Sequence, residues 1–348
     1  MRTGVVGFGA WGGIHAASLT QLRESGRTEY ELTSIACRSE ESAARARAQY
    51  PDAEVFTDYR RLLALPEVEA VHVVVPSYLH TEVALAAIEA GKHVLLEKPM
   101  ATTVEDCERI VAAAENAGAS GGPTVSIVHE LRCSEQWGAV RRASETGDIG
   151  VPHYAMLNLF RFPYRTGTGG WRYETEKVGS WVLEEPIHFF DLLLWYMEPA
   201  GHPVAVTAFT NEYAKGLSRD FSAVVQFDSG GYGVVSQTLS GFEHHQVVEL
   251  TGSDGAVRSI WSGAMDRTDK PEFSVSVKRK GATEPQLLAL DAPSGELFEI
   301  RQYIDLAHTG FAEDRSIYTP RQELELIRLC LAAEQSARTG EKVPLRPT

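Results

Sequence analysis

The chain is poor in the features that mark disulfide-rich, membrane-spanning or nucleic-acid-binding proteins. Its cysteines lie far apart and show neither metal-ligand nor redox spacing, so we expect no metal site, reduced thiols and a cytoplasmic protein. No run of about 18 apolar residues is present, so a membrane-spanning helix is not expected. Positive charge is also scarce: 33 Lys and Arg stand against 47 Asp and Glu, a net charge of -14. This disfavours nucleic acid and anionic membranes as partners.

Short apolar runs alternate with amphipathic stretches in the first third of the 348 residues, a pattern typical of a doubly wound parallel sheet. Thr103, with Asp106 three residues on, resembles a capping box at the start of one such helix, and Gly118 is its expected stop signal. We also expect no signal peptide, because the chain enters a strand directly after Met1. Strands are predicted at 3–6, 31–36, 70–75, 93–96 and 124–128, and helices at 14–24, 40–49, 59–64, 81–90 and 104–117.

Beyond residue 128 the pattern changes to strand-like segments joined by Gly, Asp and Ser turns, which predicts a largely antiparallel sheet. The length of the chain favours two domains: an α/β domain over residues 1–128 and an α+β domain over 129–348 with a large, mostly antiparallel open sheet. In the second domain, strands are predicted at 153–159, 204–210, 222–227, 233–239 and 246–250, and helices at 186–197 and 321–339.

A glycine-rich loop, Gly7-Phe8-Gly9-Ala10-Trp11-Gly12, lies between the first predicted strand and the first predicted helix. Gly7 permits the tight turn, Gly9 lets the backbone approach a pyrophosphate, and Gly12 lets the helix pack closely on the strand. The N-terminus of the helix then offers N–H groups and a positive dipole end to the phosphates. This context predicts a Rossmann domain that binds a dinucleotide cofactor, with Gly7, Gly9, Ala10, Trp11 and Gly12 around it.

The second predicted strand ends at Cys37, Arg38 and Ser39, where an NAD site usually has an acidic residue for the ribose 2′-hydroxyl. An arginine next to a hydroxyl suits a 2′-phosphate better, through charge-assisted hydrogen bonds. These three residues therefore favour NADP as the cofactor. The alternative is NAD, with Arg38 stacked on the adenine.

Two further segments carry groups suited to proton chemistry. Glu97-Lys98-Pro99 ends a predicted parallel strand, the place where open α/β sheets hold their ligands. In the second segment, Glu184 lies just before a helix predicted to begin at Pro186, and His188 lies within it. A histidine is a natural proton acceptor when an alcohol loses hydride. In the alternative interpretation, Lys98 is a solvated strand cap and His188 a buried core residue, and Asp191 is expected to be structural in either case.

With these motifs in place, the whole chain resembles the glucose-fructose oxidoreductase / inositol dehydrogenase family (Gfo/Idh/MocA). The resemblance rests on the glycine loop, on the segment 74–80 that ends in histidine, on the run 87–99 that ends in Glu-Lys-Pro, and on the acid-histidine segment. Glu184 stands where the family usually has aspartate, and Pro186 replaces a common glycine. By this resemblance Pro76, His80, Glu97 and Lys98 join the cofactor site.

The resemblance implies an NAD(P)-dependent dehydrogenase or reductase acting on a secondary alcohol of a sugar, cyclitol or sugar derivative. Lys98 would contact the substrate hydroxyl and the nicotinamide ribose, His188 would take the hydroxyl proton, and Glu184 would tune these groups. Two alternatives stay open. One is an NAD-dependent glycosidase acting by transient oxidation and elimination; the other is a sugar-sensing regulator that kept the fold and lost catalysis.

Arginines and aromatic residues follow the first strand of the second domain and are candidates for substrate contacts: Arg161, Tyr164, Trp171 and Arg172, together with Glu184 and His188. Polyols are bound by hydrogen-bonding side chains and an aromatic face, and both are present. The alternative is a solvated glycine-rich loop. Relatives assemble through the large sheet, so the resemblance also implies a homodimer or homotetramer.

Overall fold

The computed structural model describes residues 1–27, 29–160, 168–212, 218–240, 244–263, 272–290, 296–312 and 318–345. The chain divides into two compact units. The first comprises residues Met1–Glu130 and Ile300–Leu324, and the second comprises Leu131–Glu299 and Glu325–Thr348. The late segment Ile300–Leu324 thus belongs to the first unit, so the division differs from the predicted single boundary after residue 128. Within the described residues, no helix is both long and apolar enough to cross a membrane.

The first unit is built on a six-stranded parallel sheet with the order β3-β2-β1-β4-β5-β6. Its strands are short and their central apolar residues are buried because both faces are covered: Val5, Ile35, Val71 and Leu95 have no exposed surface. The predicted doubly wound parallel sheet is confirmed. The strands are β1 (Arg2–Val6), β2 (Glu31–Ala36), β3 (Glu54–Phe56), β4 (Ala70–Val73), β5 (His93–Leu96) and β6 (Val125–Ile127).

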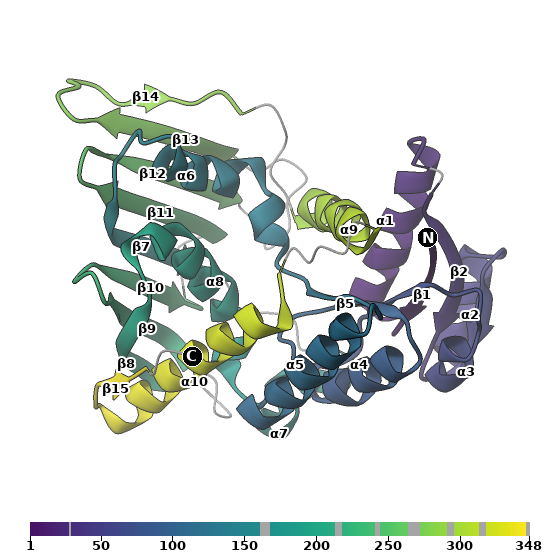
Figure 1. Ribbon diagram of the computed structural model, residues 1–348. Helices are drawn as coiled ribbons and strands as arrows, with labels where there is room; N and C mark the ends of the chain where they lie inside the picture. Colours follow the sequence, from purple (N-terminus) through teal and green to yellow (C-terminus); the bar gives the residue numbers. More distant parts are fainter. Residues whose placement is uncertain are drawn as a thin grey trace. The chain divides into compact units, whose positions relative to one another are not determined.

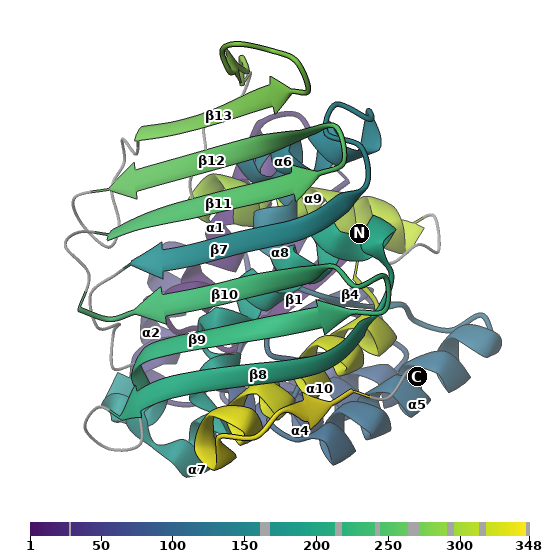
Figure 2. The same cartoon turned by 90° about the vertical axis from the view of Figure 1, so that its left-hand side faces the viewer.

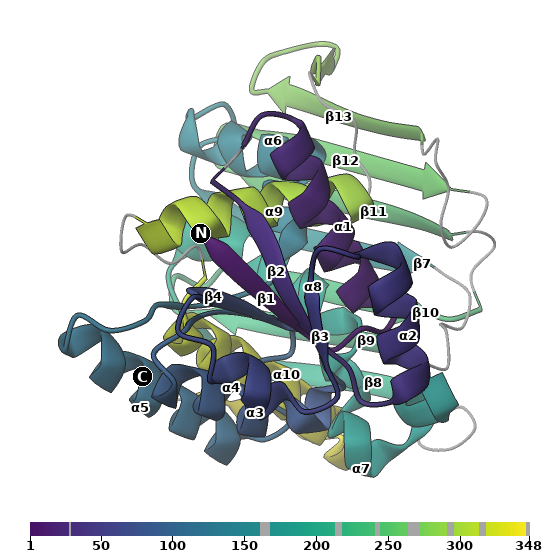
Figure 3. The same ribbon diagram turned by 90° about the vertical axis from the view of Figure 1, so that its right-hand side faces the viewer.

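Helices cover both faces of this sheet. Figure 3 shows α1 and α9 together on one side and α4 and α5 on the other. The hydroxyl of Thr103 accepts a hydrogen bond from the N–H of Asp106 at 3.1 Å, as the predicted capping box requires. The helices are α1 (Ala10–Glu24), α2 (Glu40–Gln49), α3 (Tyr59–Leu63), α4 (His80–Glu89), α5 (Val104–Ala119) and α9 (Glu296–Ala312); the short 3-10 turns η1 (Ser77–Leu79) and η2 (Glu130–Cys133) follow β4 and β6.

Several elements of the first unit differ from the sequence-based expectation. Strand β3 and helix α9 were not predicted. Helix α5 runs past Gly118 to Ala119, because the glycine in the left-handed conformation that ends the helix is Gly121, with φ +67°. Strand β4 ends at Val73, so Val74 and Val75 belong to the loop that follows it.

The second unit is built on a nine-stranded sheet with the order β14-β13-β12-β11-β7-β10-β9-β8-β15, seen face-on in Figure 2. Strands β10 and β7 pair in parallel and all other neighbours are antiparallel, which confirms the predicted mostly antiparallel sheet. The strands are β7 (Pro152–Phe160), β8 (Pro203–Glu212), β9 (Ser218–Phe227), β10 (Tyr232–Thr238), β11 (His244–Gly252), β12 (Gly255–Gly263), β13 (Glu272–Arg279), β14 (Gln286–Leu287) and β15 (Val343–Pro344).

One face of this sheet packs against helices (Figure 1). Along β7 every second side chain, Ala155, Leu157 and Leu159, is buried beneath them. The predicted helix over residues 186–197 is confirmed, whereas α6 and strands β12 to β14 were not predicted. The helical segments of this unit are α6 (Glu135–Glu145), η3 (Thr168–Tyr173), α7 (Thr175–Val178), η4 (Trp181–Leu183), α8 (Pro186–Met197), η5 (Glu198–Ala200) and most of α10 (Pro320–Thr339).

The opposite face of the sheet carries exposed apolar side chains. Register places Phe209 and Ile260 in one cross-strand row, through Ser222, Ser236, Asn158 and Val247, and Tyr232 lies opposite Tyr154 on the same face. Phe209 is 64% exposed, Tyr232 45% and Ile260 40%. Large exposed apolar side chains gathered on one surface are typical of an interaction site.

Candidate active site

The glycine loop between β1 and α1 has the geometry of a phosphate cradle. A Cβ on Gly7, whose φ is +100°, would lie 2.2 Å from the carbonyl oxygen of Val74. A Cβ on Gly12 would lie 1.9 Å from the carbonyl oxygen of Gly7, so these two glycines are required by packing. A Cβ on Gly9 would meet no atom within 4 Å. Gly9 therefore leaves an open space at the N-terminus of α1, as a bound pyrophosphate needs.

The end of β2 presents an arginine and a hydroxyl rather than a carboxylate. Arg38 is exposed and has no ion pair with any described residue, whereas Cys37 is buried and donates its backbone N–H to Phe56 at 2.8 Å. Burial raises the pKa of the Cys37 thiol. Ser39 is exposed and caps α2 by accepting the N–H of Ser42 at 3.3 Å. Arg38 and Ser39, not the thiol, are thus accessible to a cofactor.

His80 joins the two loops that follow β4 and β5. Its Nδ1 lies 2.7 Å from the carbonyl oxygen of Pro99, and its Nε2 lies 2.8 Å from the carbonyl oxygen of Val75. Pro76 lies in the same loop, where its carbonyl oxygen accepts the N–H of Leu79 at 2.8 Å. The structure therefore brings Pro76, His80 and the Glu-Lys-Pro turn together at the carboxyl ends of two neighbouring parallel strands.

Buried polar contacts hold the Glu-Lys-Pro turn on both sides of Lys98. Before the lysine, Oε1 of Glu97 lies 2.9 Å from Nε2 of His15 on α1. After it, the carbonyl of Pro99 meets His80, and the N–H of Met100 donates to Oε1 of Glu323 at 3.2 Å. The Lys98–Pro99 peptide bond is cis. These three contacts fix the backbone from which Lys98 extends.

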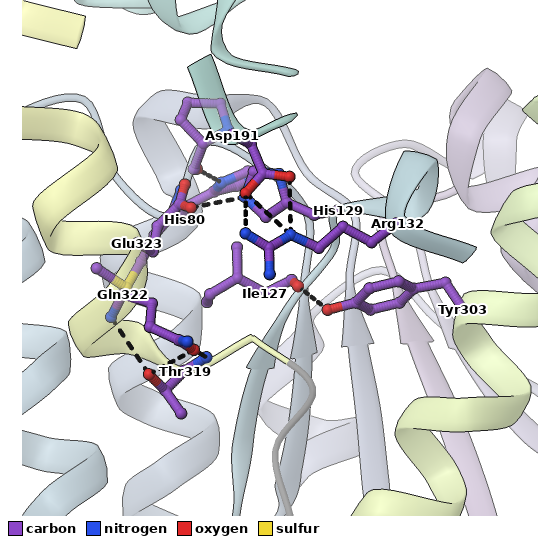
Figure 4. Close-up of polar contacts among 11 residues, drawn as sticks. His80, Ile127, His129, Arg132, Asp191, Tyr303, Thr319, Gln322 and Glu323 are labelled. Atoms are coloured by element: carbon purple, nitrogen blue, oxygen red, sulfur yellow. Dashed lines mark hydrogen bonds and ion pairs between the residues drawn. The ribbon is translucent and has the colours of Figure 1, made fainter. Parts of the chain in front are cut away.

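Glu323, at the start of α10, is itself held in place. Its second carboxylate oxygen lies 2.6 Å from Nε2 of His129, and both side chains are buried (Figure 4). The roles of His15, His129 and Glu323 were not predicted, because none of them lies in a recognisable sequence motif near Lys98. Their partners come from distant parts of the chain.

In the second unit, Glu184 and His188 lie on either side of the start of α8, where Pro186 occupies the first turn as predicted. Both side chains are buried. Glu184 pairs with Arg172, with 3.0 Å between Oε2 and the guanidinium Nε. Burial of a carboxylate costs free energy, and the arginine offsets that cost.

Asp191, one helical turn after His188, has a structural role. It accepts hydrogen bonds from Nε and Nη2 of Arg132, the shortest at 2.6 Å, in a bidentate pair drawn in Figure 4. The guanidinium of Arg132 also lies 5.3 Å from the ring centroid of Trp195. Asp191 thus anchors α8 to the segment that precedes α6, and sequence reasoning did not identify Arg132 as its partner.

The structure describes part of the predicted substrate contacts. Trp171 and Arg172 lie in η3, and the Arg172 guanidinium is 5.9 Å from the Trp171 ring. Arg161 and Tyr164 fall outside the described residues. Lys98 belongs to the first unit and Glu184 and His188 to the second, so their meeting in one site stays a prediction. Among the residues that the structure describes, no group of three His, Cys, Asp or Glu side chains is arranged to hold a metal ion.

Two family models match the chain. The model of the oxidoreductase family with an NAD-binding Rossmann fold matches residues 1–121, and the GFO/IDH/MocA C-terminal domain matches residues 137–258. The 1,5-anhydro-D-fructose reductase of Ensifer adhaerens is 32% identical over 288 residues, which are 80% of this chain and 82% of that protein.

The names of two other similar proteins mention NADP and NADH. The NADP-dependent scyllo-inositol 2-dehydrogenase of Bacillus subtilis is 28% identical over 60% of this chain and 54% of its own length. The solved structure of levoglucosan dehydrogenase with NADH and levoglucosan has a TM-score of 0.80 at 19% identity, and covers 99% of both chains. At that identity the likeness shows the fold.

The predicted fold, oxidoreductase class and nicotinamide cofactor are confirmed by these matches, and Gly9 leaves room where the cofactor phosphates would bind. The chain belongs to the Gfo/Idh/MocA family of NAD(P)-dependent oxidoreductases.

Proposed function

We propose that the protein interconverts a secondary alcohol and a ketone on a sugar or cyclitol, with NAD(P) as the redox partner. The observation that carries the proposal is the turn around Lys98, held by His15, His80 and Glu323 beside a loop with room for a pyrophosphate. The names of relatives support the substrate class: a reductase of an anhydro sugar and several inositol dehydrogenases.

The bound nicotinamide supplies the hydride chemistry. Lys98 would hydrogen-bond the substrate oxygen and stabilise the negative charge that develops on it. His188 would take the proton of the substrate hydroxyl, or return it in the reverse direction. Glu184, paired with Arg172, would set the charge around the histidine.

Arg172 is also proposed to donate hydrogen bonds to the substrate. Its Nε is paired with Glu184, and a guanidinium has further N–H donors that suit hydroxyl or carboxylate oxygens. We include Arg161, Tyr164 and Trp171 in the same proposed substrate surface. A sugar acid is therefore a member of the substrate class to be tested.

The test is a panel of sugars, sugar acids and inositols, with reduced cofactor followed by absorbance and with NAD and NADP assayed in parallel. Lys98→Ala and His188→Ala should each lower kcat by about two to four orders of magnitude, while cofactor affinity changes far less. Near-wild-type turnover in either variant would remove that residue from the mechanism. Hydrolysis of a glycoside without net cofactor reduction would instead favour the glycosidase alternative.

We further propose that the protein is a homodimer or homotetramer assembled through the exposed face of the second unit's sheet. Phe209, Tyr232 and Ile260 give that face an apolar surface with no described helix packed on it. Light scattering at micromolar concentration should give a multiple of the chain mass. Ile260→Asp should reduce it to the monomer mass, and a monomeric wild type would refute the proposal.

A further inference from the structure

A continuous row of polar side chains, a half-buried glutamate and three buried histidines, runs through the interior of the first unit. It begins at Glu97, whose carboxylate lies 2.9 Å from Nε2 of His15. Nδ1 of His15 lies 3.2 Å from Nδ1 of His72 on β4, and Nε2 of His72 lies 2.9 Å from Nε2 of His308 on α9. The three histidines are buried, with residue exposures of 0%, 0% and 2%. The function proposed above assigns no role to His72 or His308.

The far end of the row is well packed. The ring of Tyr30 contacts His308 edge-to-face at 4.8 Å, and its hydroxyl lies 2.8 Å from Oδ1 of Asp305. Arg27 donates to the other carboxylate oxygen of Asp305 at 2.8 Å. These contacts fix α9 against the sheet, and with it the position of His308.

Positive charge is disfavoured at two histidines of the row, His72 and His308. Burial lowers the pKa of His72 well below 6.5, and neighbouring His308 and His15 add to that effect. Burial also lowers the pKa of His308 to about 3. The other titratable groups that act on His308 are the N-terminal amine and His93. A neutral imidazole carries a single N–H. In each contact between two histidines of the row, one nitrogen therefore donates a hydrogen bond and the facing nitrogen accepts it.

Glu97, at the near end, has a pKa below its usual value. Burial opposes ionisation of the carboxyl group, but the hydrogen bond from His15 favours the carboxylate, and Lys98 and His80 act in the same direction. Glu97 directly precedes Lys98 in the chain, so its carboxylate is a counter-charge beside the lysine ammonium. An ammonium group is the hydrogen-bond donor that the proposed role of Lys98 requires.

These constraints fix the order of the protons. An ionised Glu97 accepts the proton on Nε2 of His15, and if that imidazole is neutral, its Nδ1 is an acceptor. His72 must then carry its proton on Nδ1, and His308 must carry its proton on Nε2. Every imidazole in the row thus donates toward Glu97.

We propose that His15, His72 and His308 form a proton-ordered chain that holds Glu97 as a carboxylate next to Lys98, and that His72 and His308 are thereby positioning residues for the active-site lysine. The effect on turnover rests on the function proposed above, whereas the proton order does not. The proton order can be observed in the protein without bound cofactor or substrate and without turnover.

The first arm of the test is imidazole ¹⁵N–¹H correlation NMR on the full-length protein near neutral pH, with rings assigned from single His→Phe variants. We expect protons on Nε2 of His15, Nδ1 of His72 and Nε2 of His308. A proton on Nε2 of His72, or a charged His15, would overturn the proposal. A wild-type protein without dehydrogenase activity would defeat the proposed function and leave this result standing.

The second arm compares His308→Phe with His308→Gln. Phenylalanine keeps the ring contact with Tyr30 but cannot donate to His72, whereas the glutamine amide can. In His308→Phe, the hydrogen bonds of the histidine row should be free to reverse their direction, which should raise the pKa of Glu97. The acid limb of the kcat profile should then move up by about one pH unit. His308→Gln should restore at least half of that shift. His153→Phe, at an exposed histidine of β7, is the control. An unchanged profile in His308→Phe would refute the link to Lys98.

Discussion

The guanidinium of Arg172 and the carboxylate of Glu184 form an ion pair, with 3.0 Å between Nε and Oε2. The side chain of Glu184 is 5% exposed and that of Arg172 is 20% exposed. The pair thus links the acid-histidine segment to η3, in which Trp171 also lies.

Removing the arginine should destabilise the protein. Arg172→Ala leaves a buried carboxylate without this cation, so we expect the free energy of unfolding to fall by about 3 kcal/mol. Arg172→Lys keeps the charge and should lose less than half of that. Arg258→Ala is the matched control, since its pair with Glu249 is largely exposed and should contribute at most about 1 kcal/mol. Urea unfolding measures all three, and equal losses would show that burial does not matter here.

Substitutions at the second and third glycines of the phosphate loop, Gly9 and Gly12, should have different effects, one on cofactor binding and the other on folding. Gly9→Ala places a methyl group in open space, at a φ of -84° that alanine adopts readily, so the protein should fold normally and bind NAD(P) more weakly. Gly12→Ala places it 1.9 Å from the carbonyl oxygen of Gly7, so the thermal midpoint should fall. Calorimetric titration with cofactor and thermal unfolding distinguish the two outcomes. Normal cofactor affinity in Gly9→Ala would contradict the cradle.

The order of strands and helices in the first unit could be predicted because long elements carry a periodic pattern. Helices α2 and α8 were predicted with their observed bounds. Strand β3, with three residues, is too short to show any period, and α9 belongs by packing to a unit whose other residues lie far earlier in the chain. Sequence separation hides that relationship.

The same reasoning applies to the candidate site. Lys98, Gly9 and His188 could be found because each lies in a local motif with a chemical meaning. His15, His129 and Glu323 could not, since a buried histidine or glutamate has no local signature of its partner. Arg172 was predicted to contact substrate, and its pairing with Glu184 follows only from the folded backbone.

Acid should destabilise the protein through its buried neutral histidines. Burial lowers the pKa of His308 to about 3, whereas an unfolded histidine titrates near about 6.5. The unfolded state therefore binds more protons between these values, so stability falls as the pH is lowered below about 6.5. One such histidine contributes at most about 1.4 kcal/mol per pH unit.

His308→Phe should remove that contribution, so the free energy of unfolding should depend less steeply on pH between about 6 and 4.5. Urea unfolding at several pH values gives the slopes. The exposed His153 offers the control, and His153→Phe should keep the wild-type slope. Parallel curves for wild type and His308→Phe would mean that His308 is not held neutral in the fold.

The preference for NADP, which we propose from Arg38 and Ser39, can be tested at the end of β2. Arg38 is exposed and has no ion pair among the described residues, so its guanidinium is available to a 2′-phosphate. Arg38→Ala should weaken NADP binding by about 1.5–3 kcal/mol, or roughly 10- to 150-fold in Kd, and weaken NAD far less. Arg109→Ala, at an exposed arginine paired with Asp106, should change neither affinity.

Cys37→Asp probes the same position from the opposite direction. A carboxylate there would repel the 2′-phosphate and accept hydrogen bonds from a ribose, so NADP should bind more weakly and NAD as well or better. Because Cys37 is buried, retained NAD affinity also reports that the variant has folded. If wild-type protein binds NAD more tightly, and Arg38→Ala weakens both cofactors equally, then Arg38 stacks on the adenine and the preference for NADP is wrong.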